Sequence, residues 1–150
     1  MKFDLFNFEK YGFDAKSSTN GHYLEIKQCS YSSETWGGTW NDTNEEKAVA
    51  FSDSRLFTVV ALWKGASDLQ FMVYGQNKAL GEHLHRLVVN RKAGNRSTQT
   101  ISMKKLIIDF GFVIIAPPDK TKVYVNSLIA QKYSRKIKLS NTDVRTIHDI

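Results

Sequence analysis

Residues 11–27 read YGFDAKSSTNGHYLEIK, two stretches of alternating apolar and polar residues around the turn sequence SSTNG. Asn-Gly between such stretches is the strongest short signal for a β-hairpin. We therefore expect strands over residues 11–16 and 22–27, joined by a type I′ turn in which Asn20 and Gly21 are the two loop residues.

This turn determines which residues of the hairpin face one another. It places Asp14 opposite Lys27 and Lys16 opposite Glu25. Because side chains in a strand alternate between two faces, all four project from the same face. The other face is apolar and predicts a core surface that consists of Phe13, Ala15, Leu24 and Ile26.

Two carboxylates and two amines on one face permit two interpretations. Asp14 and Glu25 repel one another unless a cation neutralises them, and proteins commonly hold Mg²⁺ with one or two carboxylates, water and substrate phosphate. An ammonium group beside such an ion can orient the attacking water and offset negative charge that develops on the phosphate. The alternative is that these four residues form ordinary cross-strand ion pairs, each worth about 0.2–1 kcal/mol.

The order GFDA, a turn, then YLEIK resembles the Asp…Glu-x-Lys signature of the PD-(D/E)xK nuclease superfamily, particularly its small homodimeric type II restriction endonucleases. In that family the signature lies on such a hairpin, metal ions join the two acids, and the lysine assists the hydrolytic water. The resemblance covers about residues 10–75 and implies these roles for Asp14, Glu25 and Lys27, with the backbone carbonyl of Ile26 as a further metal ligand. It implies Mg²⁺ as cofactor, with Mn²⁺ able to substitute. Many members add an acidic residue on an earlier helix. Here Glu9 or a second protomer would replace it, or the site would be degenerate.

The whole chain, residues 1–150, predicts one mixed α/β (α+β) domain, with strands early and helices late. The resemblance implies a restriction-endonuclease-like mixed sheet flanked by helices. After the hairpin, the expected elements are a polar loop over 29–42, a helix that begins with a capping box at 43–46, strands over 56–63 and 69–74, a helix over 78–91, a helix over 101–110, a strand over 112–115, a helix capped by Asp119 that continues to Tyr133, and a short helix from Ser140.

Charge is distributed unevenly along the chain. The net charge is +6, but residues 1–75 carry −3 and residues 76–150 carry +9. Residues 84–108 contain six Lys or Arg and no acidic residue, which favours contact with phosphate groups, although a solvated surface that binds nothing has the same pattern. The residues expected to contact DNA are Lys16, Trp36, His85, Arg86, Arg91, Lys92 and Arg96.

Other candidate groups have simpler explanations. Burial in the domain is the alternative role of Trp36 and Trp40. His83 and His85 are two residues apart, so they do not share a helix face and do not predict a zinc site. The lone Cys29 cannot form an internal disulfide and is expected to be a small buried hydrophobe.

These patterns together predict a metal-dependent endodeoxyribonuclease of the restriction type. Its partners would be double-stranded DNA and a second copy or a partner nuclease subunit, because cutting both strands needs two sites. The alternatives are a non-catalytic nucleic-acid-binding or partner subunit with the same fold, and an RNA-processing nuclease. No apolar run reaches the roughly 20 residues of a membrane span, and the first four residues lack a signal-peptide core, so we expect a soluble cytoplasmic protein.

Overall fold

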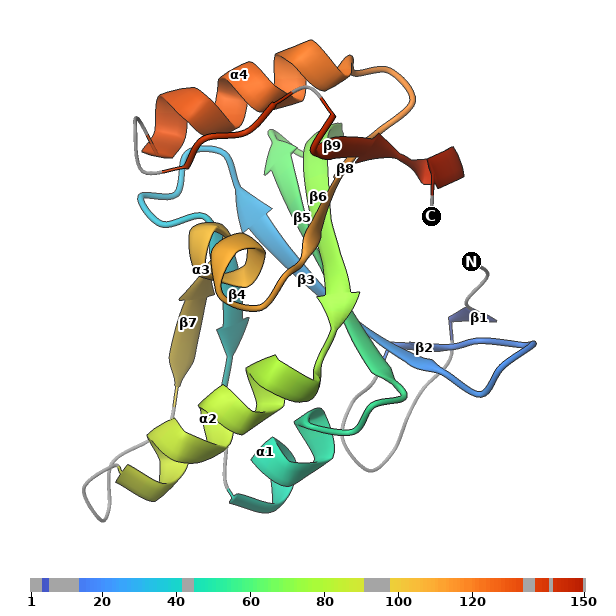
Figure 1. The fold of residues 1–150 in the computed structure, drawn as a ribbon, viewed down its shortest axis with the longest axis vertical. Coiled ribbons are helices and arrows are strands. Elements are labelled where there is room, and N and C mark those ends of the chain that lie inside the picture. The colour runs from blue at the N-terminus through green and yellow to red at the C-terminus, as the bar shows by residue number, and fades with distance from the viewer. Residues whose placement is uncertain are drawn as a thin grey trace.

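A mixed seven-stranded sheet runs through the computed structural model, which describes residues 4–5, 14–41, 45–90, 98–133, 137–140 and 142–149 (Figure 1). The strand order is β1-β2-β3-β5-β6-β8-β9. The strands are β1 (Asp4–Leu5), β2 (Ala15–Lys16), β3 (Tyr23–Ser30), β5 (Leu56–Lys64), β6 (Asp68–Gln76), β8 (Val113–Ala116) and β9 (Val144–Thr146). A mixed sheet flanked by helices confirms the predicted fold class.

The other elements cover mainly one side of this sheet. A two-stranded antiparallel ribbon and helices α1, α2 and α3 lie on the same side of β3, β5 and β6, whereas α4 lies across one end of the strands (Figure 1). No helix in the described ranges combines the length and apolar character that crossing a membrane requires. The ribbon is β4 (Gly37–Trp40) with β7 (Gln99–Ser102), and the helices are α1 (Glu45–Phe51), α2 (Lys78–Asn90), α3 (Met103–Ile108), α4 (Lys122–Tyr133) and the 3-10 helix η2 (Ile147–Asp149).

A parallel pair of strands places the polar hairpin against the hydrophobic core. β3 and β5 are parallel neighbours, which requires a crossover connection, and here that connection contains β4 and α1. Glu25 pairs with Thr58 in this register, so their side chains share a face of the sheet. The same face of β5 is fully buried and consists of Leu56, Thr58, Val60 and Leu62.

The first hairpin has a different register from the predicted one. β2 pairs with β3 through Ala15↔Leu24 and Lys16↔Tyr23. The predicted pairing of Lys16 with Glu25 is therefore wrong by two residues. The two-residue turn on which this pairing was based is also wrong. Because the shift is even, each described side chain of the hairpin still projects from the predicted face, whereas Phe13 lies outside the described residues.

The side chain of Ser17 explains the longer turn. Ser17 is 5% exposed, and its hydroxyl accepts hydrogen bonds from the backbone N–H groups of Thr19 and Asn20. The loop closes where the Ser17 N–H donates to the carbonyl of His22 at 2.7 Å. Gly21 has φ +71°, as the Asn-Gly signal requires, but it lies inside this longer loop. Local side-chain hydrogen bonds thus replaced the two-residue turn.

Several later elements match their predictions, and others differ. The strands expected over 56–63 and 69–74 and the helix over 78–91 are confirmed as β5, β6 and α2. The loop expected over 29–42 contains the end of β3 and all of β4. The strands β8 and β9 lie in the last third of the chain, so the prediction of strands early and helices late is wrong.

Two helix starts also differ from the sequence prediction. The helix expected from residue 101 begins after β7, with the Ser102 side chain accepting a hydrogen bond from the Lys105 N–H at 3.1 Å. Thr121, not Asp119, caps α4, because its hydroxyl accepts from the Tyr124 N–H at 3.0 Å. The helix expected from Ser140 is replaced by β9 and η2. The capping box expected at 43–46 lies partly outside the described residues, and α1 begins at Glu45.

Candidate active site

Asp14 is held against β3 by both its backbone and its side chain. Its N–H donates to the carbonyl of Leu24 at 2.9 Å, and its Oδ2 accepts a hydrogen bond from the N–H of Ile26 at 2.7 Å. These two contacts lie on either side of Glu25 in the sequence. The site thus brings Asp14 and Glu25 together as predicted, although Asp14 is not opposite Lys27.

Glu25 is a buried carboxylate with one oxygen unpaired. The residue is 6% exposed, and its Oε1 lies 3.0 Å from Nζ of Lys27. Its Oε2 is buried and has no hydrogen-bond partner among the described residues. Burial raises the pKa of Glu25; the ammonium of Lys27 acts against this rise, and the nearby charge of Asp14 adds to it.

The buried hydroxyl of Thr58 lies on the same face, one strand away from Glu25. Its Oγ1 also has no hydrogen-bond partner among the described residues. Buried polar atoms in proteins nearly always have a partner. Two buried oxygens on adjacent strands, Oε2 of Glu25 and Oγ1 of Thr58, thus lack a partner among the described residues.

Lys27 is held between Glu25 and the β4 strand. Its Nζ lies 5.4 Å from the centroid of the Trp40 ring, within the range of a cation–π contact. Gly38 permits this approach, because a Cβ there would lie 2.7 Å from the Trp40 ring and 3.3 Å from Cγ of Lys27. The ribbon thus fixes the direction of the lysine side chain.

The donor atoms fit a hard divalent cation held by two carboxylates. Asp14 has one oxygen that is not used by Ile26, and Glu25 has the unpaired Oε2. Leu24 and Ile26 both direct backbone groups towards Asp14, so the Ile26 carbonyl lies along the same edge of β3. Mg²⁺ commonly uses one or two carboxylates and completes its coordination with water and phosphate. Within the described ranges, no group of three or more His, Cys, Asp or Glu is placed to hold a metal.

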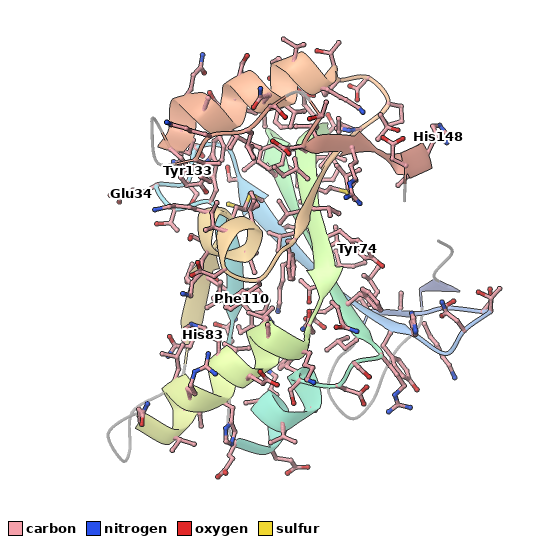
Figure 2. All side chains as sticks on the ribbon, viewed as in Figure 1. Glu34, Tyr74, His83, Phe110, Tyr133 and His148 are labelled. Atoms are coloured by element: carbon pink, nitrogen blue, oxygen red, sulfur yellow. The ribbon has the colours of Figure 1, made fainter. Side chains whose placement is uncertain are left out.

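The residues expected to contact DNA are spread over different parts of the fold. Lys16 and Arg86 are exposed, on β2 and α2. His85 lies 3.3 Å from Oε1 of Glu45, so a carboxylate of α1 already contacts it. Figure 2 shows His83 of α2 and Phe110 near one another, and their rings are 5.5 Å apart. Three more of the expected contacts, Arg91, Lys92 and Arg96, lie outside the described residues.

Trp36 is buried, so its indole is not available for stacking on a nucleic-acid base. It is 3% exposed, and its Nε1 donates to the carbonyl of Tyr31 at 3.0 Å. Lys132 of α4 places its Nζ 4.9 Å from the ring centroid and donates to the carbonyls of Ser33 and Glu34. Anchoring of the loop, the alternative considered for this tryptophan, is therefore its observed role.

Sequence reasoning missed two contributors to the site. Lys47 of α1 is near enough to Glu25 to favour its charged form, and its Nζ donates to the carbonyl of Asn41, directly after Trp40. Thr58 lies beside Glu25 only because β3 and β5 are parallel neighbours. Neither residue carries a local pattern that distinguishes it from any other lysine or threonine of this chain.

No protein-family model matches the chain, and no curated protein resembles it closely enough in sequence to count as a match. The arrangement of the site's own atoms is therefore the basis of any functional assignment.

Proposed function

We propose that this chain is a metal-dependent endonuclease that hydrolyses phosphodiester bonds in double-stranded DNA. The observation that carries the proposal is the buried Glu25 carboxylate, which has Oε1 paired with Lys27 and Oε2 unpaired among the described residues, with the charge of Asp14 near enough to raise its pKa. A buried polar atom that has no hydrogen-bond partner is costly, and the Oε2 of Glu25 has none among the described residues. A site that keeps this cost in an otherwise well-packed sheet is a candidate for function.

Each residue of the proposed site would have a separate role in hydrolysis. Asp14 and Glu25 would hold the cation, and the Ile26 carbonyl would complete the protein ligands. The bound cation would act as a Lewis acid towards the phosphate and lower the pKa of a bound water. Lys27, positioned by Glu25 and Trp40, would orient that water and offset negative charge on the phosphate.

Double-strand cutting further favours a pair of sites. A two-fold dimer places two equivalent sites on opposite strands of a duplex, and a partner nuclease subunit achieves the same result. A restriction-type homodimer is therefore the form of the enzyme that we propose, with Mg²⁺ as the cofactor and Mn²⁺ as a substitute.

A non-catalytic nucleic-acid-binding subunit is the second candidate, and one observation favours it. The ion pair of Lys27 with Glu25 already neutralises much of the charge within the protein, without a metal. In that case the same residues would stabilise the hairpin and leave the chemistry to another chain.

A plasmid-cleavage assay tests the enzyme directly. We expect the purified chain to linearise plasmid with Mg²⁺ and not with EDTA. Asp14→Asn should reduce the rate by at least about 10²-fold, the scale of losing a group that stabilises the transition state. Asp119→Asn is the matched control, because this carboxylate is exposed and remote in the sequence, and it should cleave as the wild type does. Equal cleavage by both variants would refute the assignment of the site.

Calorimetry separates the two candidates without relying on cleavage. Converging carboxylates should bind Mn²⁺ or Mg²⁺ with a heat that disappears in Glu25→Gln. A chain that binds DNA but gives no heat with either metal, in the presence or absence of DNA, would be the non-catalytic subunit.

A further inference from the structure

Two cations converge on one aromatic ring beside the carboxylates. Tyr23 and Glu25 project from the same face of β3 because they are two residues apart. The Nζ of Lys16 and the guanidinium carbon of Arg55 each lie 5.7 Å from the centroid of the Tyr23 ring. Lys16 comes from β2, and Arg55 comes from the turn before β5.

The position of Arg55 is set by several bonds, although its side chain is 61% exposed. Its backbone carbonyl accepts a hydrogen bond from the N–H of Tyr23 at 2.8 Å. Its guanidinium forms a two-point contact with Asp53, with Nε to Oδ1 at 3.1 Å and NH2 to Oδ2 at 2.8 Å. Asp53 therefore orients the guanidinium and also occupies donors that an anion from outside could use.

We propose that Lys16, Tyr23 and Arg55 form a phosphate-binding subsite that holds the DNA backbone next to the cleaved bond. The subsite rests on the proposed nuclease function and adds to it the direction in which the substrate lies. Tyr23 and Glu25 are separated by roughly 6.6 Å along an extended strand. That length is about two nucleotides of rise along one strand of a duplex. A phosphate at Tyr23 is thus a near neighbour of a phosphate at Glu25.

The charges on this face agree with a backbone path along β3. Lys16 and Arg55 lie at the Tyr23 end, and Lys27 and Lys47 lie at the Glu25 end. Lysine and arginine side chains are among the groups that contact DNA phosphates. The first hairpin therefore carries cations on both sides of the carboxylates, although residues 1–75 as a whole have a net negative charge.

Replacement of Asp53 distinguishes a phosphate subsite from ordinary surface packing. In the subsite, Asp53→Asn removes a competitor for the Arg55 guanidinium, so DNA binding should tighten several-fold. In the Arg55→Ala background the same replacement should change affinity by less than twofold. If Arg55 only packs on Tyr23, Asp53→Asn changes affinity equally in both backgrounds through net charge alone.

The measurement is fluorescence anisotropy of a labelled DNA duplex with the full chain in EDTA over a series of salt concentrations. We expect Lys16→Ala/Arg55→Ala to flatten the slope of log affinity against log salt by up to about 1.8, or about 0.9 for each lost phosphate contact. Lys138→Ala/Arg145→Ala removes the same charge near β9, at the other edge of the sheet, and is the matched control. Urea denaturation confirms that each variant is folded.

Failure of the subsite and failure of the nuclease assignment give different results. A slope no flatter than that of the control, or an Asp53→Asn effect that is equal in both backgrounds, overturns the subsite even if the chain cleaves plasmid. A chain that binds DNA through Lys16 and Arg55 but cleaves nothing with Mg²⁺ keeps the subsite and loses the nuclease assignment.

Discussion

Replacing Asp14 with alanine should reduce stability as well as cleavage, whereas replacing it with asparagine should reduce cleavage alone. The Asp14 Oδ2 accepts a hydrogen bond from the Ile26 N–H at 2.7 Å, and Asp14 is partly buried. Alanine leaves that backbone donor without its partner, whereas asparagine retains an oxygen that can accept it. The two variants therefore separate the structural role of the side chain from its charge.

The size of the effect follows from the cost of an unpaired buried donor. Such a group costs about 1–3 kcal/mol. With a urea m-value of about 2 kcal/mol/M, a loss of about 2 kcal/mol lowers the denaturation midpoint by about 1 M. Asp14→Asn should remain within about 0.5 kcal/mol of the wild type, because it keeps the hydrogen bond and removes repulsion with Glu25.

The assay is urea denaturation in EDTA, paired with plasmid cleavage in Mg²⁺. Both variants should lose at least about 10²-fold in cleavage. An alanine variant as stable as the asparagine variant would show that the Ile26 contact contributes little. Wild-type cleavage by Asp14→Asn would show that the charge of Asp14 takes no part in the reaction.

Four further predictions concern the buried carboxylate, its lysine, the loop tryptophan and the basic segment. Burial raises the pKa of Glu25 above its ordinary 4.5, so this group favours the folded state most at low pH and the contribution is lost as the pH rises through the folded pKa. In EDTA, the stability of Glu25→Gln relative to the wild type should accordingly increase as the pH rises from acidic to neutral. Urea titrations at several pH values measure this, and a difference in unfolding free energy that does not change with pH would contradict the reasoning. Lys27→Met should cleave about 10²-fold more slowly and should also be less stable, because it leaves a buried carboxylate without its cation. Adding Glu25→Gln to this variant should restore the stability but not the cleavage. Trp36→Ala should cost about 3–5 kcal/mol in unfolding free energy but leave the DNA affinity of the folded fraction unchanged; a selective loss of affinity would instead assign this ring to the DNA surface. Replacing Arg91, Lys92 and Arg96 together by alanine should flatten the slope of log DNA affinity against log salt by up to about 0.9 for each lost phosphate contact. An unchanged slope would show that these residues make no phosphate contact.

The local patterns of the sequence were sufficient to find β5, β6 and α2 and to place Glu25 and Lys27 on one face of β3. Alternation of apolar and polar residues depends on the pleat of a strand, so Glu25 and Lys27 could be placed on one face without knowing the neighbouring strands. The long apolar runs of β5 and β6 and the helical spacing of α2 depend in the same way on short-range geometry. The mixed α/β class followed from these elements.

The register of the hairpin and the neighbours of Glu25 depended on contacts between distant residues. Ser17 became buried and bonded the loop N–H groups, which outweighed the Asn-Gly signal for a two-residue turn. The strand β4 was not recognised, because residues 37–40 include two glycines and gain their strand structure by pairing with β7, some 60 residues later.

The sequence by itself therefore determined that Glu25 and Lys27 share one face of β3, and any turn with an even register shift adds Asp14 to that face. Only the tertiary structure decided that Glu25 is buried with an unpaired oxygen, that Thr58 and Lys47 are near it, and that Trp36 belongs to the core. The physical reason is that alternation is a property of neighbouring residues along one strand, whereas burial, desolvation and charge pairing depend on which strands and helices pack against it.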